Sequence, residues 1–185
     1  MTMMMADAAA ARASDRETSL TLRSRILRQL HRQHFAVLST TGADGRPSSA
    51  GVSYGVSRPD QALTFYVMTR RHLQKTRNIA QNPEVSLVVP VRRWFLWFLP
   101  PATIQVRGRA EILEATDDEG RAVFRRFWLG RRILRSYRAM ERRGETRICF
   151  LKITPDPLVR SYMVSTTVLG LVRHMEAGAG QARIS

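Results

Sequence analysis

Residues 65–91 read FYVMTRRHLQKTRNIAQNPEVSLVVPV, and the pattern of apolar residues changes its period twice within this stretch. The β-prone run over 62–68 predicts a strand. Over 72–81 the apolar residues recur at helical spacing, and the Asn-Pro pair that follows ends a helix because proline cannot continue one. Residues 84–91 return to the pattern of a strand. The stretch therefore predicts a strand, a short helix and a second strand in close succession.

Toward the N-terminus, Ser14 and Glu17 have the spacing of a helix capping box, and the apolar residues that follow predict an amphipathic helix over 17–33. The pattern then becomes that of strands. Short β-rich runs over 34–40 and 48–57 are separated by the turn sequence Gly-Ala-Asp-Gly. Together with the strand that comes next, they predict an antiparallel meander with short turns.

Toward the C-terminus, residues 102–113 alternate and predict a long strand, residues 117–143 predict a helical region broken near Gly130, and residues 147–154 predict the last clear strand. The tail after His174 is rich in Gly and Ala and is expected to be mobile. At least six strands with few helices between them predict a closed or nearly closed antiparallel barrel.

Composition limits the size and the partners of the protein. The 185 residues fit one domain, and 44% of them are apolar, which is enough for a core. Lys and Arg total 30 against 15 Asp and Glu, a net charge of +15. Lys75 and Lys152 are the two lysines, so arginine supplies nearly all of the positive charge. This charge indicates an anionic partner, but a GC-rich genome produces the same arginine bias.

Several kinds of site are excluded. Cys149 is the single cysteine and the histidines are scattered, so we expect neither a disulfide nor a metal site. No signal peptide and no apolar run of membrane-spanning length is evident, which favours a cytoplasmic protein with a flexible segment over 1–16. No Ser-His-Asp, Cys-His or paired-carboxylate pattern is recognisable, so catalytic residues stay unassigned.

Four segments, 34–40, 44–47, 65–88 and 106–111, resemble in their order the flavin-binding split-barrel superfamily. This superfamily includes pyridoxamine 5'-phosphate oxidase and relatives that use FMN or the deazaflavin coenzyme. The resemblance implies a mainly β (α+β) fold, a homodimeric six-stranded antiparallel split β-barrel with flanking helices. The expected domain covers 17–165.

Within that domain the resemblance leaves 116–143 as a helical insertion, and 166–185 follows as a C-terminal tail.

The resemblance also implies a cofactor site. Thr69 and Lys75 match the family residues that bind the cofactor's phosphate, and a lysine at a helix start suits a phosphate because it adds a charge to the exposed N–H groups. The alternative is a solvated lysine on an exposed helix. The ring of FMN, or of the deazaflavin coenzyme, would lie on the second and third strands at a dimer interface. The cofactor-binding residues expected from the resemblance are Ser53, Val67, Met68, Thr69, Arg70, Lys75 and Thr76.

The second strand departs from true pyridoxamine 5'-phosphate oxidase, because 48–55 has neither the arginine nor the lysine of that enzyme. The resemblance therefore implies the wider group of flavin- or deazaflavin-dependent oxidoreductases. Such an enzyme transfers a hydride between its cofactor and a small, hydrophobic substrate, which the sequence does not identify. The alternatives are a flavin- or haem-binding split barrel without turnover and a basic adaptor at a membrane surface.

The tryptophans lie in two arginine-flanked places, Trp94 and Trp97 in one segment and Trp128 in the arginine-rich helical region. Aromatic and arginine enrichment is typical of a dimer interface. It is also typical of peripheral membrane contact, here through 94–99 and 121–143, and a lid over a substrate is the third interpretation. No nucleic-acid-binding motif is present, and the arginines are spread over the chain, so nucleic acid is not the expected partner.

Overall fold

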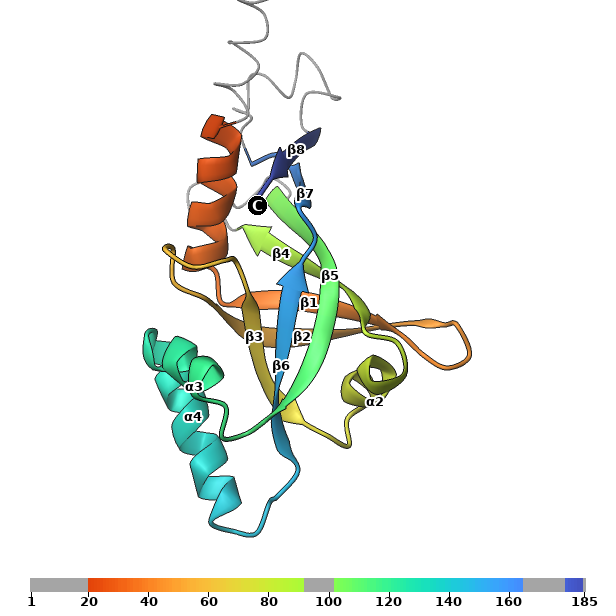
Figure 1. Ribbon diagram of the computed structural model, residues 1–185, viewed down its shortest axis with the longest axis vertical. Helices are drawn as coiled ribbons and strands as arrows, with labels where there is room; N and C mark the ends of the chain where they lie inside the picture. Colours follow the sequence, from red (N-terminus) through yellow and green to blue (C-terminus); the bar gives the residue numbers. More distant parts are fainter. Residues whose placement is uncertain (1–19, 92–101, 165–178, 185) are drawn as a thin grey trace, which may run out of the picture.

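The computed structural model describes residues 20–91, 102–164 and 179–184, and within them a β-barrel carries helices at both ends and on one side (Figure 1). An N-terminal helix covers 20–32. The strands that follow are β1 (Phe35–Thr41), β2 (Pro47–Val56), β3 (Phe65–Arg70), β4 (Glu84–Val91), β5 (Ala102–Glu114), β6 (Ile148–Pro155), β7 (Leu158–Tyr162) and β8 (Ala179–Arg183). The other helices are α2 (Gln74–Gln81), α3 (Asp118–Arg125) and α4 (Trp128–Glu141).

The barrel closes through the pairing of β4 with β5. The strands are ordered β4-β1-β2-β3-β6-β5, every neighbouring pair is antiparallel, and β5 returns to β4 with Leu87 opposite Val106. Closure leaves no unpaired edge within these six strands. The predicted six-stranded antiparallel barrel is thereby confirmed.

Alternation along the strands fills the interior of the barrel. In β4 every second residue is buried, from Val85 to Val91, because successive side chains of a strand point to opposite faces. The N-terminal helix covers the end of the barrel near β4, where Ile26 and Leu30 are fully buried in the same core. Tyr54 donates a hydrogen bond of 2.9 Å from its hydroxyl to the Leu30 carbonyl, which joins this helix to β2.

Helix α2 lies toward the opposite end of the molecule (Figure 1). Its buried face consists of Thr76, Asn78 and Ile79. The helix ends at Gln81 with Asn82 as its C-cap, as the Asn-Pro pair predicts. Asn78 donates from Nδ2 to the Thr40 hydroxyl at 3.0 Å, so a buried polar contact fixes α2 against β1. The short helix predicted over 72–81 is confirmed.

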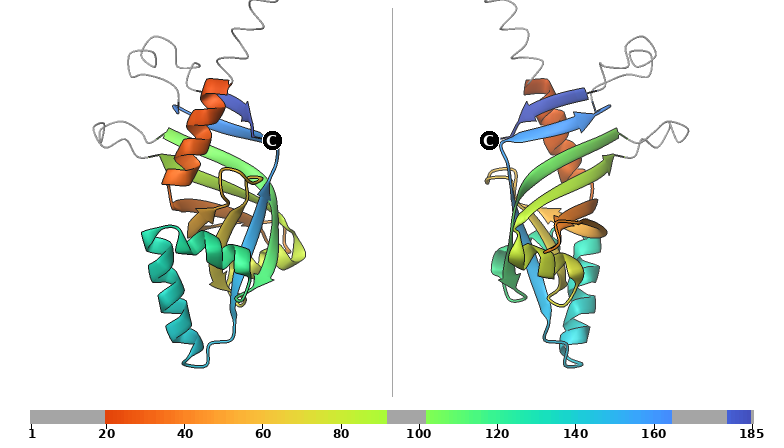
Figure 2. Two further views of the ribbon diagram at one scale, coloured as in Figure 1. Left: turned by 60° about the vertical axis from the view of Figure 1, so that its left-hand side comes forward. Right: turned by 90° about the vertical axis from the view of Figure 1, so that its right-hand side faces the viewer.

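Helices α3 and α4 cover the outer face of β2, β3 and β6 (Figure 2). Their second apolar cluster is separate from the barrel core and contains Tyr66, Val123, Phe124, Leu134 and Phe150. Asp117 caps α3 by accepting a hydrogen bond of 2.7 Å from the Gly120 N–H.

The helical region breaks earlier than predicted. The break falls at Arg126 and Phe127, and Gly130 lies inside α4. A Cβ at Gly130 would lie 2.2 Å from the Phe124 carbonyl oxygen, so this glycine is required for the close approach of the two helices and does not itself end one.

The end of the chain corrects a second expectation. The glycine-rich composition predicts a mobile tail, but residues 179–183 form β8, which pairs with β7 from Leu158↔Arg183 to Tyr162↔Ala179. Ala182 and Ile184 join the barrel core, so burial of apolar side chains holds this strand in place. The segment with Trp94 and Trp97 and residues 1–16 lie outside the described residues.

Two absences concern only the described part of the chain. It contains no helix long and apolar enough to cross a membrane. It also contains no group of three or more His, Cys, Asp or Glu side chains placed to hold a metal ion.

Candidate functional site

The connection between β3 and α2 brings a helix N-terminus to the end of a barrel strand. The Thr76 hydroxyl donates to the Arg70 carbonyl at 3.0 Å, and the Leu73 N–H donates to the same carbonyl at 3.3 Å. Leu73 is the N-cap residue of α2, and no side chain caps the helix there. The Thr76 N–H already donates to the Leu73 carbonyl at 3.0 Å, so the N–H groups of Gln74 and Lys75, at the positive end of the helix dipole, are the ones that could donate to an anion.

Lys75 is the cation of this first turn. Its side chain is half-buried, and burial lowers the pKa of its ammonium below the ordinary value of 10.5. Within the described part of the chain, Lys75 forms no hydrogen bond and no ion pair. A partly desolvated charge without a partner is unfavourable for the folded protein, and an anion at this position would relieve that cost.

The two predicted threonines of this connection are buried. Thr69 and Thr76 are both 2% exposed, so their side chains belong to the protein interior. Thr76 joins the end of β3 to the start of α2 through its bond to Arg70. The threonines therefore belong to the packed interior of this connection, whereas Lys75 is the residue of the first turn whose charge is only partly buried.

Arg70 is directed to other groups. Its Nε lies 3.9 Å from Glu145 Oε2, and its terminal nitrogen lies 3.0 Å from the Met140 sulfur. Both partners come from the end of α4 and the loop after it. These contacts direct the side chain of Arg70 toward the helical pair, its Nε forms no hydrogen bond among the described residues, and no described contact joins it to Lys75.

The residues expected to contact the ring divide between the two faces of the sheet. Val67 is 1% exposed and lies in the barrel core opposite Leu151, so its side chain cannot reach a ligand outside the barrel. Met68 is on the outer face and packs against the cluster beneath α3 and α4. Ser53 is half-exposed on β2, where it pairs with the exposed Phe35.

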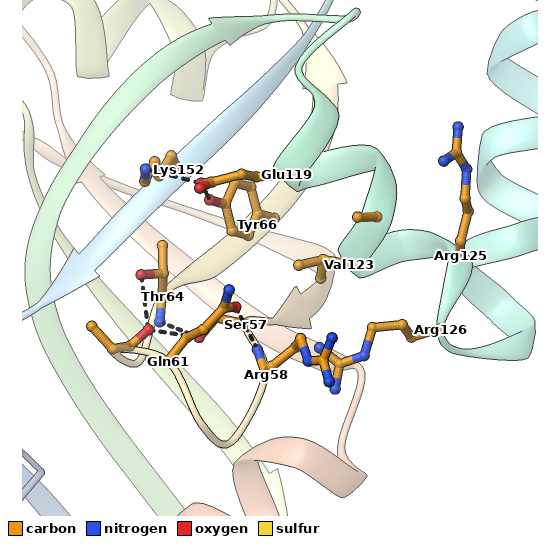
Figure 3. A pocket seen from close by; sticks show the side chains of 12 residues that line it. Ser57, Arg58, Gln61, Thr64, Tyr66, Glu119, Val123, Arg125, Arg126 and Lys152 are labelled. Atoms are coloured by element: carbon orange, nitrogen blue, oxygen red, sulfur yellow. Dashed lines mark hydrogen bonds and ion pairs between the residues drawn. The ribbon is translucent and has the colours of Figure 1, made fainter.

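The structure also contains a pocket that the sequence does not predict, a cavity of about 560 Å³ outside the barrel (Figure 3). It lies between the turn that joins β2 to β3, the outer face of β3 and β6, and helix α3. Its residues come from three distant parts of the chain and share no local motif. The one sequence signal is Lys152, the second lysine of an arginine-rich chain.

One wall of this pocket is a carboxylate held by two donors. Tyr66 donates from its hydroxyl to Glu119 Oε2 at 2.5 Å, and Lys152 Nζ lies 3.2 Å from the same oxygen. These hydrogen bonds lower the pKa of Glu119 below its ordinary value, while burial and the bond to Glu119 raise the pKa of Tyr66. At neutral pH, Glu119 is therefore ionised and Tyr66 keeps its proton.

Comparison with known proteins identifies the family of this chain. The sequence profile described as pyridoxamine 5'-phosphate oxidase matches residues 22–157. A comparison with curated protein sequences finds no match.

Solved structures share the fold. The haem storage protein HutZ of Vibrio cholerae is 16% identical, with 75% of this chain and 92% of that chain covered and a TM-score of 0.57. A haem binding protein from Mycobacterium smegmatis is 15% identical over 82% of this chain and 53% of that chain, with a TM-score of 0.58. A pyridoxamine 5'-phosphate oxidase-related, FMN binding protein from Nostoc punctiforme is 14% identical over 86% and 88%, with a TM-score of 0.54.

The profile covers most of the chain, and the closed six-stranded barrel is the fold of these structures. The chain therefore belongs to the pyridoxamine 5'-phosphate oxidase family and has a split-barrel fold.

Proposed function

We propose that the protein binds FMN with the phosphate at the start of α2 and works as a flavin-dependent oxidoreductase on a small substrate. The observation that carries the proposal is Lys75, a half-buried ammonium without a partner in the described chain, in the first turn of an uncapped helix. Membership of the family and the FMN-binding relative support the choice of a flavin.

The chemistry of these groups suits a phosphate monoester. Backbone N–H groups at a helix start are directional donors, and a lysine is a mobile point charge that needs no fixed geometry. Lys75 supplies the charge, the first turn of α2 supplies the N–H groups, and Thr76 fixes that turn to the end of β3. When bound, FMN would supply the hydride chemistry, while the chain would orient it and exclude water.

The outer face of the barrel offers the ring a limited surface. Ser53 and Phe35 lie on the exposed part of β1 and β2, whereas Met68 is already in contact with the helical pair. We infer that the ring lies nearer Ser53 than Met68. In the proposed homodimer, the exposed Phe35 would be covered by the second subunit, and light scattering after gel filtration measures this oligomeric state.

Titration of the purified protein with FMN, followed by quenching of flavin fluorescence, tests the proposal. The Lys75→Ala variant is expected to bind more weakly. The matched control is Arg77→Ala, which removes a positive charge from the exposed side of the same helix and is expected to bind as the native chain does. Equal affinity in the native and Lys75→Ala proteins would show that the phosphate lies elsewhere.

Parallel titrations separate the cofactors. The deazaflavin coenzyme and haem are titrated in the same way, because two structural relatives bear haem in their names. Tighter binding of either would replace FMN as the proposed cofactor. Oxidation of the reduced cofactor by a panel of quinones and enones then separates an enzyme from a carrier without turnover.

A further inference from the structure

The cavity beside α3 carries an excess of positive charge. Its lining contains four basic residues and one acidic residue: Arg58, Arg125, Arg126, Lys152 and Glu119. It is distinct from the proposed phosphate site, because neither Lys75 nor any residue of α2 lines it. At about 560 Å³ it has the volume of a site for a small organic molecule.

Two arginines from different elements supply charge to this cavity from the side of the β2–β3 turn. Arg126, at the end of α3, donates from one terminal nitrogen to the Val56 carbonyl at 3.5 Å, which directs its guanidinium toward the end of β2. Arg58 follows in the turn, and Figure 3 shows the two side chains at the same end of the pocket. Arg126 uses one terminal nitrogen for Val56, and Arg58 uses its Nε for an exposed ion pair with Asp60, so the other donors of both groups remain available to a ligand.

The turn that carries Arg58 is fixed before any ligand binds. The Ser57 hydroxyl donates to the Ala62 carbonyl at 2.8 Å and accepts from the Thr64 N–H at 3.0 Å. The Gln61 N–H donates to the Arg58 carbonyl at 3.0 Å. A preformed turn reduces the conformational entropy that a ligand would otherwise have to overcome.

The opposite wall has a different chemistry. Glu119 is ionised and held in place by Tyr66 and Lys152, so it accepts hydrogen bonds and repels a second anion. Val123 and Ala122 contribute apolar surface along α3. From one end to the other, the pocket therefore presents cations, an apolar wall and a hydrogen-bond acceptor.

We propose that this pocket binds a small organic anion, with its carboxylate or phosphate group at Arg58 and Arg126. The apolar body of the ligand lies along Val123, and a hydroxyl or amino donor, where present, faces Glu119. The site goes beyond the proposed flavin function and does not depend on it, because no residue is shared between the two.

Nuclear magnetic resonance on cofactor-free protein tests the site with three probes: phenyl phosphate, 4-hydroxybenzoate and neutral benzyl alcohol. The two anions are expected to shift the amide signals of Ser57, Gln61 and Thr64 in a saturable way, and benzyl alcohol is expected to leave them unchanged. Phenyl phosphate and 4-hydroxybenzoate distinguish phosphate from carboxylate as the preferred group. Absence of saturable shifts at these amides would overturn the proposal.

Variants then separate this pocket from the general positive charge of the chain. Arg126→Ala is expected to lower the affinity for phenyl phosphate about tenfold, the effect of losing a hydrogen bond to a charged group. Arg135→Ala removes an exposed arginine of α4 outside the cavity and is expected to change nothing. Equal losses in both variants would show diffuse attraction and overturn the proposed site.

Glu119→Gln gives a readout of the opposite sign. It removes a negative charge from the wall, so phenyl phosphate is expected to bind more tightly, and weaker binding would contradict the proposed orientation. Lys75→Ala is expected to leave the titration of the Ser57, Gln61 and Thr64 signals unchanged, because phenyl phosphate bound at the start of α2 would shift the signals of that helix instead. Failure of the flavin proposal would therefore not affect this result, and the two can be judged separately.

Discussion

Positive charge is held in two different ways in this molecule. On α2, Lys75 is a half-buried ammonium whose pKa is lowered by burial. On α4, the exposed face carries arginines in contact with water and without ion pairs among the described residues: Arg131, Arg132, Arg135 and Arg138. A desolvated cation gains much more from a ligand than a hydrated one does. The difference teaches that one partly buried cation can indicate a candidate phosphate site, whereas a row of hydrated arginines on a helix face does not by itself indicate one.

The largest expected effect tests whether the helical pair is structurally part of the barrel. Phe124 is fully buried and meets the Phe150 ring edge-on, with centroids 5.5 Å apart. Phe124→Ala is expected to lower the free energy of unfolding by about 3–5 kcal/mol, because it opens a cavity in the second cluster. Chemical denaturation followed by circular dichroism measures this value.

Two controls sharpen that comparison. Phe35→Ala makes the same change at a residue that is 51% exposed in the single chain, and in dilute protein, where a dimer would dissociate, we expect a loss below about 1 kcal/mol. Lys75→Ala is expected to change stability by no more than about 0.5 kcal/mol, because it removes an unpaired charge. A loss for Phe35→Ala that grows with protein concentration would support the proposed subunit interface at Phe35, and a large loss in dilute protein would contradict its exposure in the single chain.

The second-largest effect is expected in FMN binding, where it distinguishes the half-buried Lys75 from the exposed arginines of α4. Lys75→Ala is expected to weaken the binding free energy of FMN by about 1.5–3 kcal/mol, the range for a hydrogen bond to a charged group. Arg135→Ala on α4 is expected to leave FMN affinity unchanged. Fluorescence titration measures both, and a matching loss in Arg135→Ala would mean that the net charge of the chain attracts FMN without a defined site.

The barrel could be predicted from the sequence because its strands alternate and its turns are short. The Asn-Pro pair after α2 and the alternation along β4 are signals carried by neighbouring residues, so they do not depend on contacts between distant parts of the chain. The break between α3 and α4 could not be placed from the sequence. Gly130 is required by the close contact with Phe124, and the residue pattern of a single helix does not show its contacts with another helix. The sequence does not reveal β8, because its pairing partner and the burial of its Ala182 are supplied by the fold.

The same reasoning explains which site residues were predictable. The position of Lys75 at a helix start could be predicted because a strand and a turn precede it in sequence, whereas its phosphate contact is implied by the family resemblance and stays a prediction. Val67 was expected to contact the ring, but strand alternation turns its side chain into the core. The wall formed by Tyr66, Glu119 and Lys152 could not be predicted, because these residues meet only when β3, α3 and β6 pack together.

The third prediction uses pH to sharpen the contrast between lysine and arginine. The pKa of Lys75 lies below 10.5 in the free protein, and a bound phosphate would raise it. The complex therefore holds more protons than the free protein between the two pKa values, and FMN affinity should fall as pH rises through that window. Titration calorimetry between about pH 8 and pH 10 measures the fall.

The Lys75→Arg variant provides the control for that experiment, because it keeps a positive charge in the first turn of α2. Arginine stays protonated throughout this range, and the variant is expected to bind FMN with little dependence on pH. An equally steep fall in the Lys75→Arg variant would assign the titration to another group and contradict the role of Lys75.

The smallest effect of a single substitution is expected at the exposed arginines of α4, for which we predict contact with a membrane surface. Exposed arginines contribute about 1 kcal/mol each to attraction by an anionic membrane, and salt screens that attraction. Trp128, 61% exposed with Arg132 5.1 Å from its ring centroid, stands at the start of the same face. Co-sedimentation with phosphatidylglycerol vesicles is expected to fall in small additive steps in Arg135→Ala and Arg138→Ala and to disappear at high salt. Loss of all binding from one such substitution would mean that α4 holds a specific site, and the contrast with Lys75 would then fail.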